Sequence, residues 1–277
     1  MSDARSRDER STPGHGPVAR PTRDASVTMW RAPGLSDVPG VVHGFTGRTT
    51  HPDDPRAPAL DLARRGGVPD DELASRWQAV ARGLHPGLSA SDVVLLHQVH
   101  GARVLRATGP TGPLAVLGEA DAVFTDVPGL ALAIRTADCV PVLLAGRRHV
   151  GAAHSGWRGT VAGVVPALVD ALRAAGEAPS RLVAAVGPAI SGEAYEVGDE
   201  VVQGLRAAGL DDRDFLHPGG DRPHVDLRAA VRAQLLRAGV GRVDVLPHCT
   251  VHDPRLHSHR RDGAASGRQA AVIARCP

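Results

Sequence analysis

Three short segments of the chain carry side chains that bind metals or transfer protons. Residues 96–101 read LHQVHG, residues 136–141 read TADCVP and residues 152–159 read AAHSGWRG. Each segment places a histidine or a cysteine at the end of an apolar stretch, beside a glycine or proline turn, and α/β proteins build sites at such strand ends. His100, Cys139 and His154 together suit catalytic zinc, which takes three protein ligands and leaves one position for water or substrate.

The spacing of these residues is a weaker signal than their chemical types, because it fits no zinc-finger template. In an extended segment His97 and His100 point to opposite faces, so both cannot bind one ion from a regular strand, and His100 lies at the turn. The ordinary interpretations stay open: hydrogen-bonded histidines at strand ends and a small buried cysteine. Asp138, next to Cys139 in the sequence, is a partner of the ligands, a general base or a turn residue.

The apolar pattern predicts one α/β domain, with strands in the middle of the chain and helices around them. Residues 48–65 contain turn formers and predict a loop, whereas residues 70–84 predict an amphipathic helix. Further helices are expected within residues 160–176, 198–209 and 226–239, and Pro166 should kink the first of these or delay its start. Buried strands are predicted at residues 93–99, 122–126, 130–134, 140–145, 149–153, 182–186 and 270–274.

Composition excludes several classes of protein. The 277 residues are 42% hydrophobic and their net charge is only +2, so neither a fibrous protein nor a duplex-binding protein is expected. No stretch is long and apolar enough for a membrane helix. Three cysteines cannot form a disulfide framework in a chain of this length, so we expect a reducing, cytoplasmic location. Residues 1–26 predict a disordered tail without a secretory signal, and residues 27–277 the catalytic domain.

Several strings in the chain occur in the order typical of one family. They are HGFTGR, LHQVHG, EADAVFTD, TADCVPVLL, AAHSGWRGTVAG, VGPAISGEAYEVG and a C-terminal CT, SHRR and GR. The chain thus resembles the multicopper polyphenol oxidase (laccase-domain) family, also called the purine nucleoside phosphorylase or peptidoglycan editing factor family. The resemblance runs from about Val41 to Ile273 and implies a single α/β domain with packed mixed sheets between helices.

The resemblance also implies an activity and its cofactor. It implies zinc on His100, Cys139 and His154, and a phosphorylase for adenosine, guanosine, inosine and methylthioadenosine that also deaminates adenosine. The expected partners are therefore a purine nucleoside and phosphate, without nucleic acid or membrane, in a monomer or weak dimer. The preferred nucleoside is not determined by the sequence.

Additional residues are candidates for substrate binding. Arg48 and the pair Arg260 and Arg261 could hold phosphate through guanidinium hydrogen bonds, although the pair could also be solvated. His43 could orient phosphate or protonate the leaving base, or make a structural hydrogen bond.

The C-terminal string departs from the family pattern FSYRR. This chain reads HSHRR there, so two aromatic positions carry His257 and His259. If these side chains line the nucleoside pocket, imidazole replaces the usual aromatic stacking. Cys249 precedes this string and has no assigned role.

Three alternative functions stay open. Copper oxidation of phenols requires an axial methionine or further histidine sites, and the chain has methionine only at Met1 and Met29. A cysteine hydrolase that edits a peptidoglycan precursor would use Cys139 as nucleophile and His154 as base. The third alternative is a non-enzymatic factor in cell-wall synthesis or division.

Overall fold

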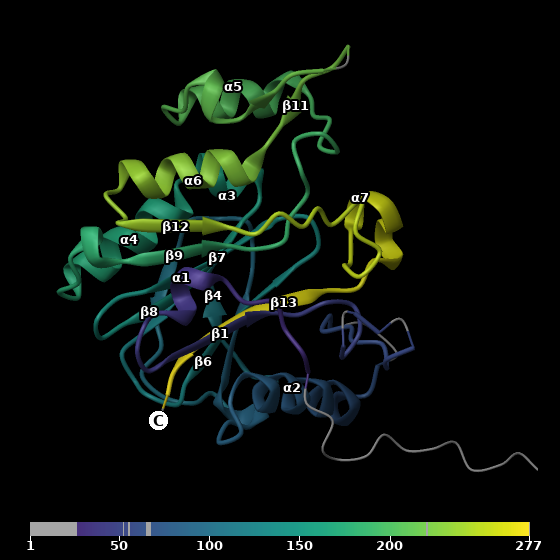
Figure 1. The fold of residues 1–277 in the computed structure, drawn as a ribbon, viewed down its shortest axis with the longest axis vertical. Coiled ribbons are helices and arrows are strands. Elements are labelled where there is room, and N and C mark those ends of the chain that lie inside the picture. The colour runs from purple at the N-terminus through teal and green to yellow at the C-terminus, as the bar shows by residue number, and fades with distance from the viewer. Residues whose placement is uncertain (1–26, 52, 55, 65–67, 220, 277) are drawn as a thin grey trace, which may run out of the picture.

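Two mixed sheets form the centre of the molecule, flanked by helices (Figure 1), as the sequence predicts. The structure is a computed structural model and describes residues 27–51, 53–54, 56–64, 68–219 and 221–276. The predicted tail at residues 1–26 lies outside the described residues. None of the helices in the described ranges combines the length and apolar character that a membrane span requires.

The first sheet has five strands in the order β1-β13-β6-β2-β4, with β2 parallel to both neighbours and the other pairs antiparallel. Its strands are β1 (Val41–Phe45), β13 (Gln269–Arg275), β6 (Ala131–Thr136), β2 (Val93–His97) and β4 (Val116–Glu119). The last strand in the sequence thus occupies an interior position of this sheet.

The second sheet has six strands in the order β12-β9-β7-β8-β5-β3, with parallel pairs only at its two edges. Its strands are β12 (Arg242–Val245), β9 (Val183–Val186), β7 (Val140–Ala145), β8 (Val150–Ser155), β5 (Ala122–Thr125) and β3 (Val104–Arg106). A separate hairpin pairs β10 (Leu216–His217) with β11 (His224–Val225).

Seven α-helices surround the sheets in the described part of the chain. They are α1 (Pro33–Ser36), α2 (Asp70–Leu84), α3 (Trp157–Val161), α4 (Val164–Ala174), α5 (Asp199–Ala207), α6 (Leu227–Arg237) and α7 (His259–Asp262). The helix predicted within residues 160–176 starts at Val164, since Gly163 adopts a left-handed conformation with φ 77° and Pro166 then lies in the first turn, where proline is tolerated.

Each sheet is buried on both faces, which explains the nearly continuous apolar runs of the strands. Alternate residues of β6 show this: Leu132 and Ile134 pack against the second sheet, whereas Ala131 and Ala133 pack toward α2. On the far side of the second sheet, α6 covers β7, β9 and β12 and α4 covers β8, β5 and β3, while α5 packs outside them against α3. The layers therefore run helix, sheet, sheet, helix.

The chain passes from one sheet to the other between β6 and β7. These strands are consecutive in sequence but belong to different sheets, so the short connection at residues 137–139 spans the gap between the sheets. Two of the three segments with candidate ligands lie here. TADCVP contains the connection itself, and AAHSGWRG begins on β8, which pairs with β7 in the second sheet.

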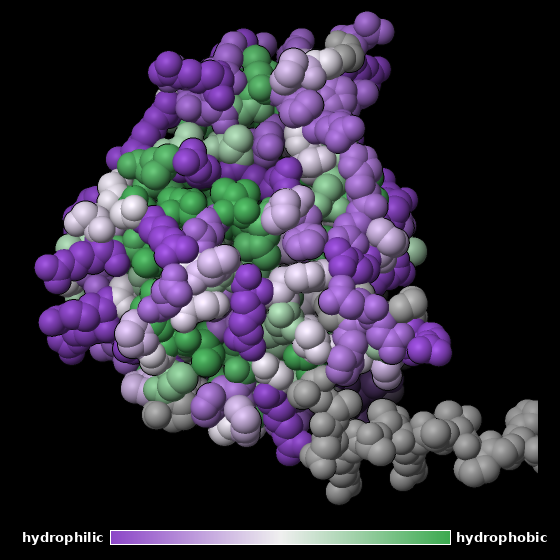
Figure 2. All heavy atoms as spheres, in the orientation of Figure 1, coloured by the Kyte–Doolittle hydropathy of each residue, from purple (hydrophilic) through white to green (hydrophobic). Residues whose placement is uncertain are grey.

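The face shown in Figure 2 is hydrophilic around much of its margin, with a hydrophobic area near β12 and β9. β12 forms one edge of the second sheet, and Val245 there is 39% exposed. Charged residues protect this edge: Arg242 pairs with Asp37 and Asp244, and Asp244 accepts a hydrogen bond from the backbone N–H of Gly34.

Glu177 holds the turn between β7 and β8. Its buried carboxylate accepts hydrogen bonds from the backbone N–H groups of Arg147, Arg148 and His149 and from the His149 ring. Burial alone would raise the pKa of Glu177, but these hydrogen bonds outweigh it and lower the pKa to about 2. The ionised carboxylate therefore stabilises the folded state.

We predict that Glu177→Gln lowers the free energy of unfolding at pH 7 by about 3 kcal/mol, since the pKa differs by roughly two units from its unfolded value. Because the folded pKa is depressed, this stabilisation is present above about pH 4.5 and lost as the pH falls toward 2. Chemical denaturation of wild type and variant from pH 7 to pH 3 measures the difference. Glu193→Gln, at an exposed glutamate, is the control; a difference that does not change with pH would contradict the prediction.

Candidate metal centre and cavity

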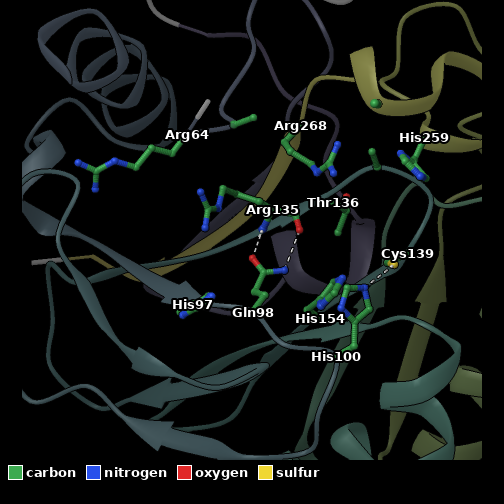
Figure 3. A pocket seen from close by; sticks show the side chains of 13 residues that line it. Arg64, His97, Gln98, His100, Arg135, Thr136, Cys139, His154, His259 and Arg268 are labelled. Carbon is green, nitrogen blue, oxygen red and sulfur yellow. Dashed lines mark hydrogen bonds between the residues drawn. The ribbon is translucent and has the colours of Figure 1, made fainter. Parts of the chain in front are cut away.

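His100, Cys139 and His154 come together at the gap between the two sheets (Figure 3). One ligand atom from each residue can be chosen so that all three lie within 4.8 Å of one another. The Cys139 Sγ lies 3.8 Å from His100 Nε2, and the rings of His100 and His154 are 4.7 Å apart at 73°. His100 follows β2, Cys139 precedes β7 and His154 lies on β8, so both sheets position the cluster.

Asp121 holds two of these three residues, His100 and His154, in place. Its carboxylate is fully buried and accepts a hydrogen bond of 2.8 Å from His154 Nδ1. The same carboxylate accepts hydrogen bonds from the backbone N–H groups of Val99, His100 and Gly101. Because Nδ1 of His154 is engaged, its Nε2 is the ring nitrogen left available to a metal. Burial raises the pKa of Asp121, but the His154 and backbone hydrogen bonds outweigh it, so the carboxylate is ionised.

Backbone conformations at the cluster are unusual. Three described non-glycine residues have positive φ, and two of them are His100 (φ 63°) and Asp138 (φ 86°). Such conformations are costly and persist where surrounding contacts enforce them. For His100 those contacts come from Asp121. For Asp138 they come from the Thr250 hydroxyl, which donates to Oδ1, and the backbone N–H of Arg260, which donates to Oδ2.

Gln98 joins the two strands beside the cluster. Its side chain donates to the backbone carbonyl of Arg135 at 2.8 Å and accepts from the backbone N–H of Arg135 at 3.0 Å. These bonds replace the sheet pairing where β2 and β6 separate, since the pairing of these strands is limited to residues 93–94 and 131–132. Gln98 thereby fixes the start of the segment that carries His100.

Gly156 leaves the space between the ligands open. A Cβ atom at this position would lie 2.9 Å from His100 Cδ2 and 3.0 Å from Cys139 Sγ, closer than atoms approach without displacement. Gly156 also precedes the first residue of α3. Two imidazoles and a thiol with converging ligand atoms are a donor set that zinc accepts. The residues present therefore fit a metal ion of this kind.

The charges of the cluster suit metal binding as well. Burial would raise the pKa of Cys139, but the imidazoles of His154 and His100 outweigh it and lower that pKa. Burial would lower the pKa of His154, but the Cys139 thiolate and the Asp121 carboxylate outweigh it and raise that pKa. Without a metal, the pair thus favours a thiolate next to an imidazolium, and a cation that binds there displaces the imidazolium proton.

A cavity of about 590 Å³ opens beside the cluster and includes all three residues in its wall. From there it extends over the end of the first sheet, past Arg135 and Arg268 to Arg64 (Figure 3). His259, at the start of α7, lines the same cavity. Volumes of several hundred cubic ångströms are typical of pockets for small molecules.

The other predicted site residues lie outside the cavity wall. Asp138 has both carboxylate oxygens engaged, as described above, so it braces the connection instead of facing a ligand. Arg260 donates to the backbone carbonyl of Glu196, and its guanidinium lies over the ring of Tyr195. Arg261 forms a two-point ion pair with Asp262 and donates to backbone carbonyls.

His43 and Arg48 are likewise not brought to the cluster. His43 is buried on β1, and its Nε2 accepts a hydrogen bond of 2.8 Å from the backbone N–H of Ala32. Burial and the neighbouring Arg31 guanidinium lower the pKa of His43 to about 4. Arg48 extends toward the Pro254 carbonyl at 3.5 Å. Of the roles considered for His43, the structure therefore shows the structural hydrogen bond.

The two histidines that depart from the family pattern have different positions. His257 is buried, bonds the Leu60 carbonyl through Nε2 and contacts Gly267 closely, so it packs within the fold, away from the cavity. His259 does line the cavity. Cys249 accepts hydrogen bonds from the hydroxyl and backbone N–H of Ser191.

Sequence reasoning missed Asp121, Gln98 and the cavity arginines. Asp121 carried a usable signal: it stands between two alanines at the start of an apolar strand, and a buried carboxylate is costly unless it is paired. Gln98 lies within the LHQVHG string, but its partner is a backbone group 37 residues away. Arg135 interrupts an apolar run, which also marks it as exceptional.

We predict that Asp121→Asn weakens zinc binding by roughly 10–100-fold, the usual effect of removing a carboxylate behind a ligating histidine. The reason is that an amide nitrogen cannot accept the hydrogen bonds from His154 and the 99–101 backbone. Competition with a chromophoric chelator measures the affinity. Asp126→Asn, which removes a surface partner of Arg106, is the control; wild-type affinity in a folded Asp121→Asn protein would contradict the role.

Comparisons with known proteins place the chain in a family. The family model described as multi-copper polyphenol oxidoreductase laccase matches residues 42–276. A protein named purine nucleoside phosphorylase from Deinococcus radiodurans is 40% identical over 249 residues, 89% of this chain and 92% of its own. A protein named adenosine deaminase RL5, from an unknown prokaryotic organism, is 34% identical over 75% of this chain and 84% of its own. The crystal structure of YlmD from Geobacillus stearothermophilus superimposes with a TM-score of 0.77 at 30% identity, covering 89% of this chain and 94% of that one. The chain therefore belongs to the multi-copper polyphenol oxidoreductase laccase family.

Proposed function

We propose that the protein is a zinc-dependent purine nucleoside phosphorylase that also deaminates adenosine. The observation that carries the proposal is the convergence of His100, Cys139 and His154 on the wall of a cavity of about 590 Å³. The names of relatives that match most of the chain, a purine nucleoside phosphorylase and an adenosine deaminase, support the choice of reaction.

The donor set favours zinc over copper. Blue-copper sites use two histidines, a cysteine and a weak axial methionine. Met29 is 9% exposed and packs in the core beside α2, and Met1 lies outside the described residues. Within the described ranges, one cluster of three or more histidine, cysteine or acidic residues has the geometry of a metal site. A laccase requires additional copper centres, so the family's oxidase description is not the activity that we propose.

The residues of the chain divide the chemistry between them. Zinc at the cluster would supply a Lewis acid with an open coordination position. Asp121 keeps His154 oriented, and Gly156 keeps the approach to the cluster free. His259 presents an imidazole on the cavity wall, the side-chain type that most often transfers protons in catalysis. A purine nucleoside that fills the cavity would lie within reach of both the cluster and this imidazole.

The function is tested with inosine in the presence and absence of phosphate. We expect ribose 1-phosphate and hypoxanthine only when phosphate is present, and conversion of adenosine to inosine in either condition. Cys139→Ala should lose most of its zinc and both activities, because one of three ligands is removed, whereas Cys276→Ala should keep them. Elemental analysis and chromatography measure the two outcomes. Full turnover by a zinc-free Cys139→Ala protein would refute the proposal.

We further predict that zinc binding to the metal-free protein at pH 7 releases about one proton, since the raised pKa of His154 keeps its imidazole protonated there. Cys139, with its lowered pKa, contributes little to this release near neutral pH. Titration calorimetry in two buffers with different ionisation enthalpies measures the number of protons. Because His154 loses its proton above its raised pKa, the release should diminish as the pH approaches 9. A release of two protons at pH 7 would show that Cys139 is a neutral thiol in the metal-free protein, and would contradict the prediction.

A second candidate function rests on the same charges. The thiolate of Cys139 beside the imidazolium of His154 is also the arrangement of a cysteine hydrolase, and this alternative would suit an editing enzyme for a peptidoglycan precursor. Chelation separates the two functions. A hydrolase that uses Cys139 as nucleophile keeps its activity in metal-free protein and loses it with iodoacetamide, whereas the phosphorylase loses its activity in both cases.

A further inference from the structure

Among the described residues, the wall of the cavity beside the metal cluster contains arginines but no carboxylate side chain. Of the 13 lining residues in the described part of the chain, three are arginines, four are histidines and none is an aspartate or glutamate. The arginines are Arg64, Arg135 and Arg268. In Figure 3 they follow one another along the cavity, away from the cluster. A concave surface with an excess of positive charge concentrates anionic ligands.

Arg135 and Arg268 are fixed in position but keep N–H groups available. Arg135 donates from Nη2 to the Leu96 carbonyl at 3.1 Å. Arg268 donates from Nη1 to the carbonyls of Ser266 and Gly267. The described residues provide neither guanidinium with an ion-pair partner. Neighbouring strands hold the two arginines close together, since Arg135 pairs in register with Ala270 on β13.

The positive charges of Arg135 and Arg268 repel each other in the protein without a ligand. Burial lowers the pKa of Arg135, and the charges of Arg268 and Arg64 lower it further. A dianion placed between the guanidinium groups removes this repulsion and accepts their free N–H groups in pairs. By contrast, Arg64 is exposed and already paired with Asp70 at 2.9 Å, so it acts at the outer end of the cavity.

A second observation at the same wall is the side chain of Thr136. This residue lines the cavity and is 2% exposed, yet its hydroxyl has no hydrogen-bond partner among the described residues. A buried polar group without a partner costs roughly 1–3 kcal/mol. Thr136 follows Arg135 in the sequence, and its side chain lies between Arg135 and the metal cluster. An oxyanion bound there would give the hydroxyl an acceptor.

We propose that Arg135, Arg268 and Thr136 form the binding site for the phosphate co-substrate. The proposal rests on the phosphorylase function proposed above. It assigns the phosphate to the cavity arginines and not to the exposed pair Arg260 and Arg261. Arg48, Arg260 and Arg261 lie outside the cavity wall, whereas Arg135 and Arg268 line it, and each of these two still has N–H groups beyond those that bond carbonyls.

The location matches the reaction. In phosphorolysis the bond between ribose C1′ and the purine N9 breaks, a phosphate oxygen forms the new bond to C1′, and the base leaves with the electron pair and takes up a proton. The nucleophile must therefore lie beside the ribose. A phosphate held at Thr136 and Arg135 is adjacent to the residues that carry the cluster, because Thr136 is three residues before Cys139.

The test measures binding of inorganic phosphate directly, by ³¹P line broadening or titration calorimetry of the zinc-loaded protein. Arg135→Gln and Arg268→Gln should each weaken phosphate binding by roughly 10–100-fold, the value of a charged hydrogen bond. Arg173→Gln, which removes an exposed arginine paired with Asp170, is the matched control and should bind as wild type does. Wild-type phosphate affinity in both cavity variants would overturn the assignment.

Thr136→Val gives a readout that a structural role would not produce. Because the hydroxyl has no partner in the fold, its replacement by a methyl group should leave the melting temperature unchanged or higher, while phosphate affinity falls. A lower melting temperature with unaltered phosphate affinity would remove Thr136 from the site.

The two proposals can fail separately. If the arginine variants keep the wild-type KM for phosphate while inosine is still cleaved, the site assignment fails and the function stands. If phosphate binds through these arginines but no ribose 1-phosphate forms, the function fails and the site stands. Inosine 5′-monophosphate is the third probe: if it alone binds in an arginine-dependent way, the oxyanion belongs to a nucleotide and the assignment to free phosphate is overturned.

Discussion

The carboxylate of Asp121 is the group on which the arrangement of the site depends. It is excluded from water, and it accepts hydrogen bonds from one imidazole and three consecutive backbone N–H groups. A buried charge is stable only when it is satisfied in this way. The same four bonds determine where His154 points and force the backbone of His100 into a left-handed conformation. Burial of one charge thus sets the geometry of two histidines of the cluster, which come from different sheets.

The layered architecture explains why the cluster lies where it does. Strands buried on both faces leave no room for polar chemistry in their centres, so reactive groups collect where the chain leaves a sheet. The connection between β6 and β7 is such a place, because it carries Cys139 from one sheet to the other. There the end of the first sheet contributes Arg135 and Thr136, and the second contributes His154. The cavity and the cluster are therefore two sides of one junction.

The sequence predicted elements whose signal is local and missed those whose partners are distant. The helix at residues 70–84 and the central strands matched because their periodicity directly reports burial. β12, with the sequence RVDV, and β1 were missed, because short strands with polar residues acquire their pairing from other parts of the chain. Likewise, His43 has a string that resembles a site, yet pairing of β1 with β13 buries it. Arg135 and Arg268 line the cavity while Arg260 and Arg261 do not, because the pairing of β6 with β13 brings the first two to one sheet end, and that long-range pairing cannot be read from the local sequence.

The interior position of β13 has a consequence for how the protein is made. β13 is inserted between β1 and β6, although those two strands leave the ribosome long before it. Until residue 275 has been released, both neighbours present unpaired edges, which are the surfaces by which nascent chains aggregate. His259 and Arg268 of the cavity wall lie shortly before β13 in the sequence. A chain that lacks β13 should therefore fail to complete the first sheet and expose strand edges that promote aggregation, so its loss affects folding before it affects chemistry.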